Sequence, residues 1–211
     1  MKVPRGVFIT LEGGEGAGKT TLARRLAAAL ALAGQPVLRT REPGGAPGAE
    51  ALRALLLGGT VAWDPVAEAM LMFAARREHL AKTIAPALAA GAWVICDRFA
   101  DSTLAYQCHG HGLDPSVWRV LYEVALPGFA PDLTLVLDLP PEAGMARAAA
   151  RGEPDRFERL GPEFHARVHA GFRRIAAENP DRCVLLDALL PPEPLYAAAA
   201  EALRDRLGAP L

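Results

Sequence analysis

Residues 13–20 read Gly-Gly-Glu-Gly-Ala-Gly-Lys-Thr, the pattern G-x-x-x-x-G-K-T, and they stand between an apolar run and a helix-prone run. The apolar run is Val7–Leu11, and an Ala- and Leu-rich stretch from Thr21 to Ala33 follows the loop. Glycines let backbone N–H groups turn inward around phosphate oxygens, and the N-terminus of a helix adds the positive end of its dipole. A strand, a loop and a helix in this order predict a phosphate-binding P-loop, and therefore a nucleoside triphosphate as ligand.

Two side chains of this loop have expected tasks of their own. Lys19 would reach the β- and γ-phosphates, and the Thr20 hydroxyl would ligate the Mg²⁺ that accompanies ATP. The residues expected to bind the triphosphate are Gly13, Gly14, Gly16, Ala17, Gly18, Lys19, Thr20 and Thr21.

The composition argues against several other classes of protein. The formal charge of -1 over 211 residues gives no general attraction to nucleic acid or to a membrane surface. No apolar run approaches the ~20 residues that span a bilayer, and the N-terminus leads directly into the first expected strand, which leaves no room for a signal peptide. Three cysteines without metal-type spacing indicate reduced thiols. We expect a cytoplasmic protein with neither a nucleic acid polymer nor a membrane as partner.

Short apolar segments alternate with longer helical ones along the chain. Expected strands are Val7–Leu11, Pro36–Thr40, Trp93–Cys96, Leu133–Leu139 and Cys183–Leu186. Helices are expected to begin at Asp64-Pro65 and Asp114-Pro115, where an N-cap residue precedes proline, and a further helix at about 194–207. Strands that are apolar on both faces and alternate with helices predict an α/β fold, a doubly wound five-stranded parallel sheet with helices on both faces, in one domain.

The strand Trp93–Cys96 ends in Asp97-Arg98. At the tip of a strand beside the loop, Asp97 could hold Mg²⁺ and Arg98 could grip a second phosphate with its two-pronged guanidinium; a surface ion pair is the alternative. A GTPase is excluded, because its base-reading N-K-x-D is absent and the chain's single asparagine, Asn179, precedes a proline.

Two further segments have both a functional and an ordinary interpretation. In the expected helix 68–82, Phe73 and Arg77 share a face and could stack on a base and bond its edge, or could be a core aromatic and a solvated charge. Segment 142–159 is rich in arginine and could be a lid over the transferring phosphate or a charged surface helix.

Taken together, these motifs resemble the bacterial thymidylate kinases over nearly the whole chain. The resemblance depends on Leu11–Thr20, on Thr40-Arg41-Glu42-Pro43-Gly44-Gly45, on Leu71–Phe73 with Arg77, on Asp97-Arg98 through Tyr106-Gln107, and on Arg147–Arg156. It implies a P-loop nucleotide kinase that transfers the γ-phosphoryl group of ATP to dTMP, with Mg²⁺, as a homodimer.

The resemblance also implies a role for individual residues. Phe73 would stack on thymine and Arg77 would bond O4 of the base, while Tyr106 would crowd the sugar 2′ position. The remaining acceptor-binding residues would be Arg41, Glu42, Arg98, Ser102, Thr103 and Gln107. The catalytic set would be Glu15, Lys19, Arg98, Arg147, Arg151 and Arg156, with Thr20 and Asp97 at the metal.

One position divides the family into two branches. Gly16 stands where one branch places an arginine, and the other branch takes its catalytic guanidinium from the lid, which favours a lid role for Arg147, Arg151 and Arg156. Other interpretations stay open: a kinase for another nucleoside monophosphate, a kinase for a small non-nucleotide metabolite, and a non-enzymatic ATP-binding module.

Overall fold

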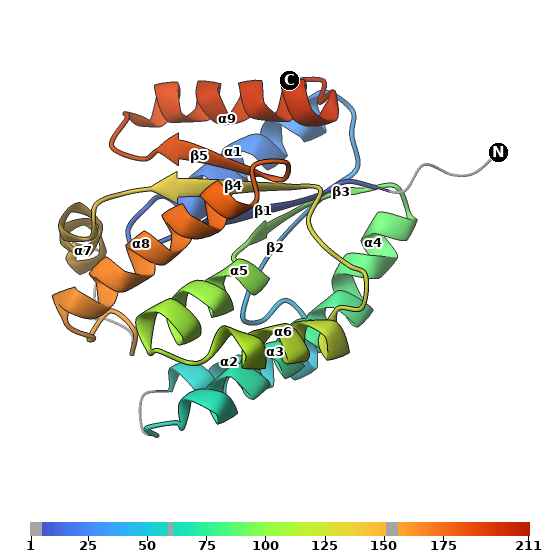
Figure 1. Ribbon diagram of the computed structural model, residues 1–211. Coiled ribbons are helices and arrows are strands. Elements are labelled where there is room, and N and C mark those ends of the chain that lie inside the picture. Colours follow the sequence, from blue (N-terminus) through green and yellow to red (C-terminus); the bar gives the residue numbers. More distant parts are fainter. Residues whose placement is uncertain (1–5, 59–60, 151–155) are drawn as a thin grey trace.

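A computed structural model describes residues 6–58, 61–150 and 156–211, and its centre is a parallel five-stranded sheet (Figure 1). The strands are β1 (Phe8–Gly13), β2 (Val37–Arg41), β3 (Trp93–Asp97), β4 (Leu133–Asp138) and β5 (Cys183–Asp187). They lie side by side in the order β2-β3-β1-β4-β5. All five strands expected from the apolar runs are present, and the predicted parallel α/β sheet is confirmed.

Helices cover both faces of this sheet (Figure 1). One face is covered by α1 (Lys19–Leu32) and α9 (Pro192–Leu207). The helical segments of the other face and of its surroundings are α2 (Pro47–Leu57), α3 (Pro65–His79), η1 (Leu80–Ile84), α4 (Ala85–Ala89), α5 (Ala100–Thr103), η2 (Leu104–Gly110), α6 (Pro115–Ala125) and α8 (Pro162–Glu178). The short α7 (Pro141–Ala149) follows β4 and lies beyond the tips of the strands.

The expected helix starts are confirmed by their capping bonds. Asp64 accepts hydrogen bonds at Oδ1 from the backbone N–H groups of Val66 and Ala67, and Asp114 accepts one from Ser116. Each cap satisfies donors that the first helical turn leaves unpaired, and the proline after it has no N–H to satisfy. These caps fix the beginnings of α3 and α6.

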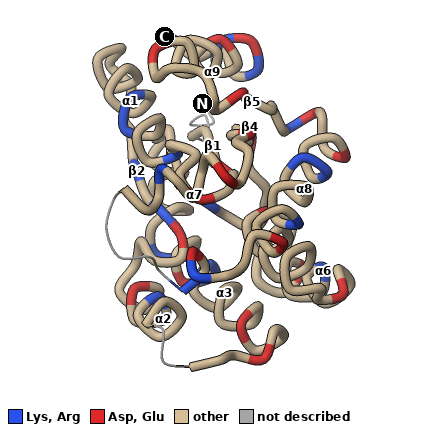
Figure 2. The backbone as a smooth tube through the Cα atoms, turned by 90° about the vertical axis from the view of Figure 1, so that its left-hand side faces the viewer, with Lys and Arg blue, Asp and Glu red and all other residues tan. Residues whose placement is uncertain are grey.

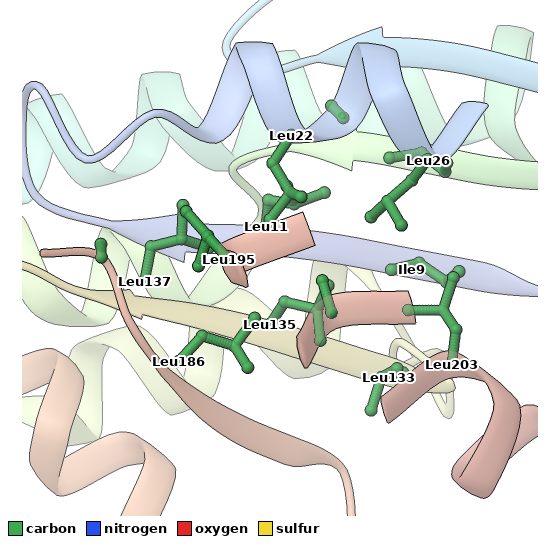
Figure 3. Packing of buried hydrophobic residues seen from close by; sticks show 14 of the residues in the cluster. Ile9, Leu11, Leu22, Leu26, Leu133, Leu135, Leu137, Leu186, Leu195 and Leu203 are labelled. Carbon is green, nitrogen blue, oxygen red and sulfur yellow. The ribbon is translucent and has the colours of Figure 1, made fainter. Parts of the chain in front are cut away.

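The largest hydrophobic cluster joins the sheet to α1 and α9 (Figure 3). Ile9 and Leu11 of β1 are fully buried, and Leu26 of α1 and Leu203 of α9 pack with them in the same cluster. Fully burying one such side chain stabilises the fold by about 1.5–3 kcal/mol. Close packing on both faces makes the sheet a rigid support for the loops at its edge.

Every strand of a parallel sheet ends at the same edge. In this sheet β2 and β3 lie on one side of β1 and β4 and β5 lie on the other, so the strand order switches direction at β1. In such sheets ligands bind at the carboxyl ends of the strands, where the order switches. Figure 2 looks onto this edge and shows acidic and basic segments side by side between α1, α7 and α3.

Two expectations from composition can be compared with the structure. Cys96, Cys108 and Cys183 are all buried, and each is a free thiol. Among the residues that the structure describes, no helix is long and apolar enough to cross a membrane.

Candidate active site

The loop between β1 and α1 forms one side of a cavity at the sheet edge. The cavity is lined by Glu15, Gly16, Ala17, Gly18, Lys19, Thr20, Thr21, Asp97, Arg98 and Arg147. Gly13 and Gly14 contribute through their carbonyl groups, which accept hydrogen bonds from Lys19 Nζ at 3.0 and 2.7 Å. The sequence motif therefore folds as a cradle at the N-terminus of α1, as a P-loop requires. We name the cavity beside this loop the P-loop cavity.

Lys19 lies in this loop with its ammonium group mostly buried. Burial, together with the nearby Arg98 guanidinium, lowers the pKa of Lys19 to about 8. A bound polyphosphate would favour the charged form and raise the pKa again. The free protein therefore holds an ammonium group that loses its proton just above neutral pH.

This pKa predicts a pH dependence for the use of ATP. Because the charged form of Lys19 is lost as the pH rises through about 8, we expect kcat/KM for ATP to fall about tenfold per pH unit above that value. We expect kcat to persist to higher pH, since bound ATP stabilises the ammonium form. Steady-state kinetics between pH 7 and 10 would measure both. A kcat/KM that stays level up to pH 10 would contradict the prediction, and Lys19→Arg, which cannot lose its charge, serves as the control.

Thr20 and Asp97 both line the P-loop cavity, and they are in direct contact. The Thr20 hydroxyl donates a hydrogen bond to Asp97 Oδ2 at 2.6 Å, which places the two predicted metal ligands together. Both offer oxygen, the donor atom that Mg²⁺ prefers, and Mg²⁺ commonly keeps several waters and takes only one or two protein ligands. The donor set fits a magnesium ion bound together with a triphosphate.

Helix α7 is seated directly on the loop through two glycines. A Cβ at Gly16 would lie 2.1 Å from the carbonyl oxygen of Gly144, and a Cβ at Gly144 would lie 2.4 Å from that of Glu15. Gly16 also has a positive φ of 67°. No side chain fits at position 16 with α7 in this place, and the same contact brings Arg147 of α7 to the cavity, where its Nη1 donates to the Ala188 carbonyl oxygen.

A second cavity opens beside the first, and we name it the acceptor cavity. Its lining consists of Glu15, Thr20, Arg41, Glu42, Pro43, Arg53, Leu57, Met72, Arg76, Asp97, Arg98, Ser102, Thr103, Tyr106, Gln107 and Phe157. Among the described residues, Glu15, Thr20, Asp97 and Arg98 line both cavities. A group bound in one cavity can thus meet a group bound in the other at these four side chains.

Arg98 is held firmly at this junction. Its Nη1 donates to the Gly13 carbonyl oxygen at 3.0 Å, and its Nη2 donates to Glu15 Oε1 at 2.7 Å and to the Tyr106 hydroxyl at 3.0 Å. Burial acts against the charge, but Glu15 and the other nearby acids outweigh it and raise the pKa of Arg98. Its φ of 69° is rare for a residue with a side chain, a form of backbone strain that collects at functional sites.

The segment after Arg98 is fixed by a residue for which the sequence predicted no role. Glu12, at the end of β1, accepts hydrogen bonds from the Phe99 backbone N–H at 2.7 Å and from the Ser102 hydroxyl at 2.6 Å. Burial, reinforced by Asp101, raises the pKa of Glu12 to about 7. Its place next to the glycine motif was visible in the sequence, but nothing there revealed which segment it would contact.

The arginine predicted to face the acceptor cavity from α3 is wrong by one position. Arg77 is exposed and donates from Nη1 to the Ala125 carbonyl oxygen at 3.3 Å, whereas Arg76 is buried and lines the acceptor cavity. Successive helical residues point about 100° apart, so α3 can turn only one of the two toward the cavity. Arg76 donates to Glu42 Oε2 at 2.7 Å and to the Thr103 hydroxyl at 3.1 Å.

The stacking assignment of Phe73 is corrected in the same way. Its ring is 2% exposed and packs against Trp118 and Tyr122, with the Arg76 guanidinium 4.8 Å from its centroid. A ring buried in this way has no face left for a base. Met72, one position earlier, lines the acceptor cavity in its place.

All the other predicted acceptor-binding residues line this cavity: Arg41, Glu42, Arg98, Ser102, Thr103, Tyr106 and Gln107. Glu42 also receives a hydrogen-bonding contact from the fully buried His79, whose Nδ1 lies 3.0 Å from Glu42 Oε1. Arg76, Glu42 and His79 thus form a buried network in which Arg76 and Glu42 line the cavity.

The three arginines predicted to form the lid differ in where they lie relative to the two cavities. Arg147 lines the P-loop cavity, and Arg151 lies outside the described residues. Arg156 lines neither cavity: its Nη2 is bonded to the buried Glu68 carboxylate and its Nη1 donates to the Leu56 carbonyl oxygen. The expected place of Arg156 over the transferring phosphate is therefore corrected, because a buried carboxylate holds it on the acceptor side.

A P-loop, a Thr–Asp pair suited to Mg²⁺ and an arginine shared with a second, polar cavity define an ATP-dependent nucleoside monophosphate kinase. Comparisons with known proteins narrow this class. The family described as thymidylate kinase matches residues 11–198. The chain therefore belongs to the thymidylate kinase family.

Individual thymidylate kinases are similar to this chain over nearly its full length. The chain is 53% identical over 205 residues to a thymidylate kinase of Caulobacter vibrioides, covering 97% of this chain and 99% of the relative. It is 46% identical over 212 residues to that of Trichlorobacter lovleyi, covering 97% and 100%. The crystal structure of thymidylate kinase from Ehrlichia chaffeensis superposes with a TM-score of 0.76 at 34% identity, covering 95% of this chain and 99% of that one.

Proposed function

We propose that this protein transfers the γ-phosphoryl group of ATP to dTMP, giving dTDP and ADP, and so supplies dTTP synthesis. The single observation that carries the proposal is Arg98, which lines both cavities and is held by Glu15, Tyr106 and the P-loop backbone. Phosphoryl transfer needs donor and acceptor in line, with positive charge between them. Arg98 supplies both the charge and the position.

The other residues divide the work around this point. Lys19 binds the β- and γ-phosphates, and Thr20 and Asp97 hold Mg²⁺ or its water shell, which neutralises charge on the donor phosphates when bound. Arg98 binds the acceptor phosphate, with Arg41 and Glu42 beside it. No general base is needed, because a phosphate monoester is largely ionised near neutral pH.

The chain works as one P-loop domain whose lid is segment 142–159. The direct contact of Gly16 with Gly144 leaves no room for an arginine in the loop, and α7 brings Arg147 to the same place. Arg147 therefore serves as a lid cation for the transferring group, and the same role is proposed for Arg151, which lies outside the described residues. Arg156 serves the acceptor side instead, as its bond to Glu68 supports.

The acceptor cavity suits a pyrimidine deoxynucleotide. Arg76 presents a donor-only guanidinium for a carbonyl oxygen such as O4, and Met72 offers an apolar, polarisable contact for the ring. The Tyr106 hydroxyl donates to Glu15 Oε1 at 2.6 Å, and the ring fixed in this way would crowd the 2′ position of the acceptor sugar and favour deoxyribose.

ADP release with single acceptors tests this proposal. With ATP and Mg²⁺ we expect strong turnover with dTMP, weaker turnover with dUMP, and almost none with UMP or with purine nucleotides. Preference for a purine acceptor would refute the assignment of the acceptor cavity to a pyrimidine, although the protein would still be a nucleotide kinase. Absence of acceptor-stimulated turnover would refute the proposal.

The protein is further proposed to work in the cytoplasm as a homodimer. Val66 and Met70 on α3 are exposed at 40% and 54%, and Val120 and Val124 on the adjoining α6 at 64% and 76%. Exposed apolar side chains on two helices that pack together are typical of a self-association surface.

This interface gives a specific prediction. We expect Val124→Asp to convert a dimer into a monomer in sedimentation velocity at micromolar concentration, since an unpaired charge would be buried between the copies. Leu32→Asp, at a 91% exposed position on α1, is the matched control and should leave the dimer intact. A wild-type protein that sediments as a monomer would contradict the proposal.

A further inference from the structure

A buried carboxylate behind the acceptor cavity has two partners and no place in the proposed mechanism. Glu68, in the first turn of α3, is 1% exposed. Its Oε1 accepts a hydrogen bond from Gln107 Nε2 at 2.7 Å, and its Oε2 accepts one from Arg156 Nη2. Glu68 does not itself line the acceptor cavity, whereas Gln107 does.

These contacts determine the orientation of the Gln107 amide. An amide has a donor edge and an acceptor edge, and either can face a ligand if the surroundings allow it. A carboxylate paired with a guanidinium can only accept, so Gln107 must direct its Nε2 toward Glu68. Its Oε1, on the opposite edge of the amide, is thereby committed to the role of acceptor.

Arg156 supports this arrangement through the charge it supplies. A guanidinium can only donate, so it requires an acceptor at Glu68 Oε2, as the Gln107 amide N–H requires one at Oε1. The ion pair with Arg156 keeps Glu68 an acceptor. The lid segment and the base pocket are joined at this carboxylate.

We propose that Glu68 is a positioning residue for base selectivity, and that it discriminates thymine from cytosine by holding Gln107 as a hydrogen-bond acceptor. Thymine offers a ring N–H donor next to a carbonyl acceptor, which matches Gln107 Oε1 as acceptor and Arg76 as donor, two residues that line the same cavity. Cytosine offers a ring acceptor next to an amino donor, which opposes both. The proposal rests on the proposed function, because it concerns the acceptor of that same reaction.

Glu68→Gln tests the proposal with little change of shape. A glutamine at position 68 can both donate and accept, so the Gln107 amide becomes free to turn over and meet cytosine. We expect the ratio of kcat/KM for dTMP to kcat/KM for dCMP to fall by about tenfold or more, mainly through a lower KM for dCMP. A purely structural role would lower both rates together. A ratio within twofold of wild type would overturn the proposal.

A second background tests whether Glu68 acts through Gln107. In Gln107→Leu, the further change Glu68→Gln is expected to leave the dTMP to dCMP ratio unchanged, because the positioned amide is gone. An additional tenfold fall in that background would overturn the proposal. The exchanged pair Glu68→Gln with Gln107→Glu again presents an acceptor to the base and is expected to recover preference for dTMP; a ratio as low as that of Glu68→Gln alone would count against the mechanism.

The controls separate this inference from the function on which it rests. Glu193→Gln removes a surface carboxylate that is paired with Arg25, and it should change neither ratio nor rate. Thermal unfolding of each variant verifies the fold. A wild-type protein without activity on dTMP would refute the proposed function, whereas an active wild type with an unchanged Glu68→Gln ratio would refute this inference alone.

Discussion

Arg98→Ala is expected to lower kcat for phosphoryl transfer to dTMP by about 10³-fold or more, while the affinity for ATP changes only a few-fold. Removal of a single donor aimed at transition-state charge typically costs about 10²–10³ in kcat, and Arg98 carries both a charge and several such donors. ATP binding is expected to survive, because Lys19 and the backbone of the loop remain. Turnover and calorimetric binding of a non-hydrolysable ATP analogue measure the two quantities separately.

The backbone at position 98 does not complicate this variant. Alanine and arginine have the same Cβ, so the positive φ of 69° strains both alike and substitution adds no new penalty. Arg24→Ala, on the exposed side of α1, is the matched control and should behave as wild type. Comparable turnover by Arg98→Ala would remove the proposed role of the shared arginine.

Arg76→Ala is expected to weaken dTMP binding at least a hundredfold and to destabilise the protein. Its removal leaves Glu42 buried without its guanidinium partner, and breaking a buried pair in this way costs about 3–5 kcal/mol. For a chain of this size that corresponds to a fall in Tm of roughly 6–20 °C. The KM for dTMP and a thermal scan measure the two effects.

Arg77→Ala provides the matched control from the next residue of the same helix. Arg77 is exposed and makes one long hydrogen bond to a backbone carbonyl, so we expect near wild-type KM and Tm. A high KM in Arg77→Ala with a normal one in Arg76→Ala would reverse the assignment drawn from the structure.

The fold could be predicted from the sequence because its signals are local. Strands buried on both faces appear as continuous apolar runs, and the Asp-Pro pairs mark helix starts by their own capping chemistry. The glycines of the motif predict the tight turn of the P-loop. The helices α2 and α8 were not predicted, because apolar and charged residues alternate in them without a start signal as distinct as an Asp-Pro pair.

The face of α3 could not be predicted in the same way. Leu71, Met72 and Phe73 are all apolar, so Met72 with Arg76 and Phe73 with Arg77 give the same spacing, and the aromatic ring favoured the second pair. The packing of Phe73 determines which face of α3 is turned to the cavity. Phe73 packs against Trp118 and Tyr122, and Arg76 therefore faces the acceptor cavity.

Long-range partners were equally invisible to local patterns. Arg156 belongs to a run of arginines that resembles a lid, and only the fold shows that Glu68, 88 positions earlier in the chain, binds it. By contrast, Thr20 and Asp97 were both predicted as metal ligands, and they do lie together, because the start of α1 and the end of β3 are at the same edge of the parallel sheet.

The most direct test of the central claim is the fate of the γ-phosphoryl group itself. ATP labelled at the γ-phosphorus, incubated with the protein, Mg²⁺ and dTMP, is expected to give labelled dTDP, with the transfer lost when the metal is chelated. Label that appears as inorganic phosphate whether or not dTMP is present would show hydrolysis instead of transfer, and would contradict the assignment of the two cavities as donor and acceptor sites.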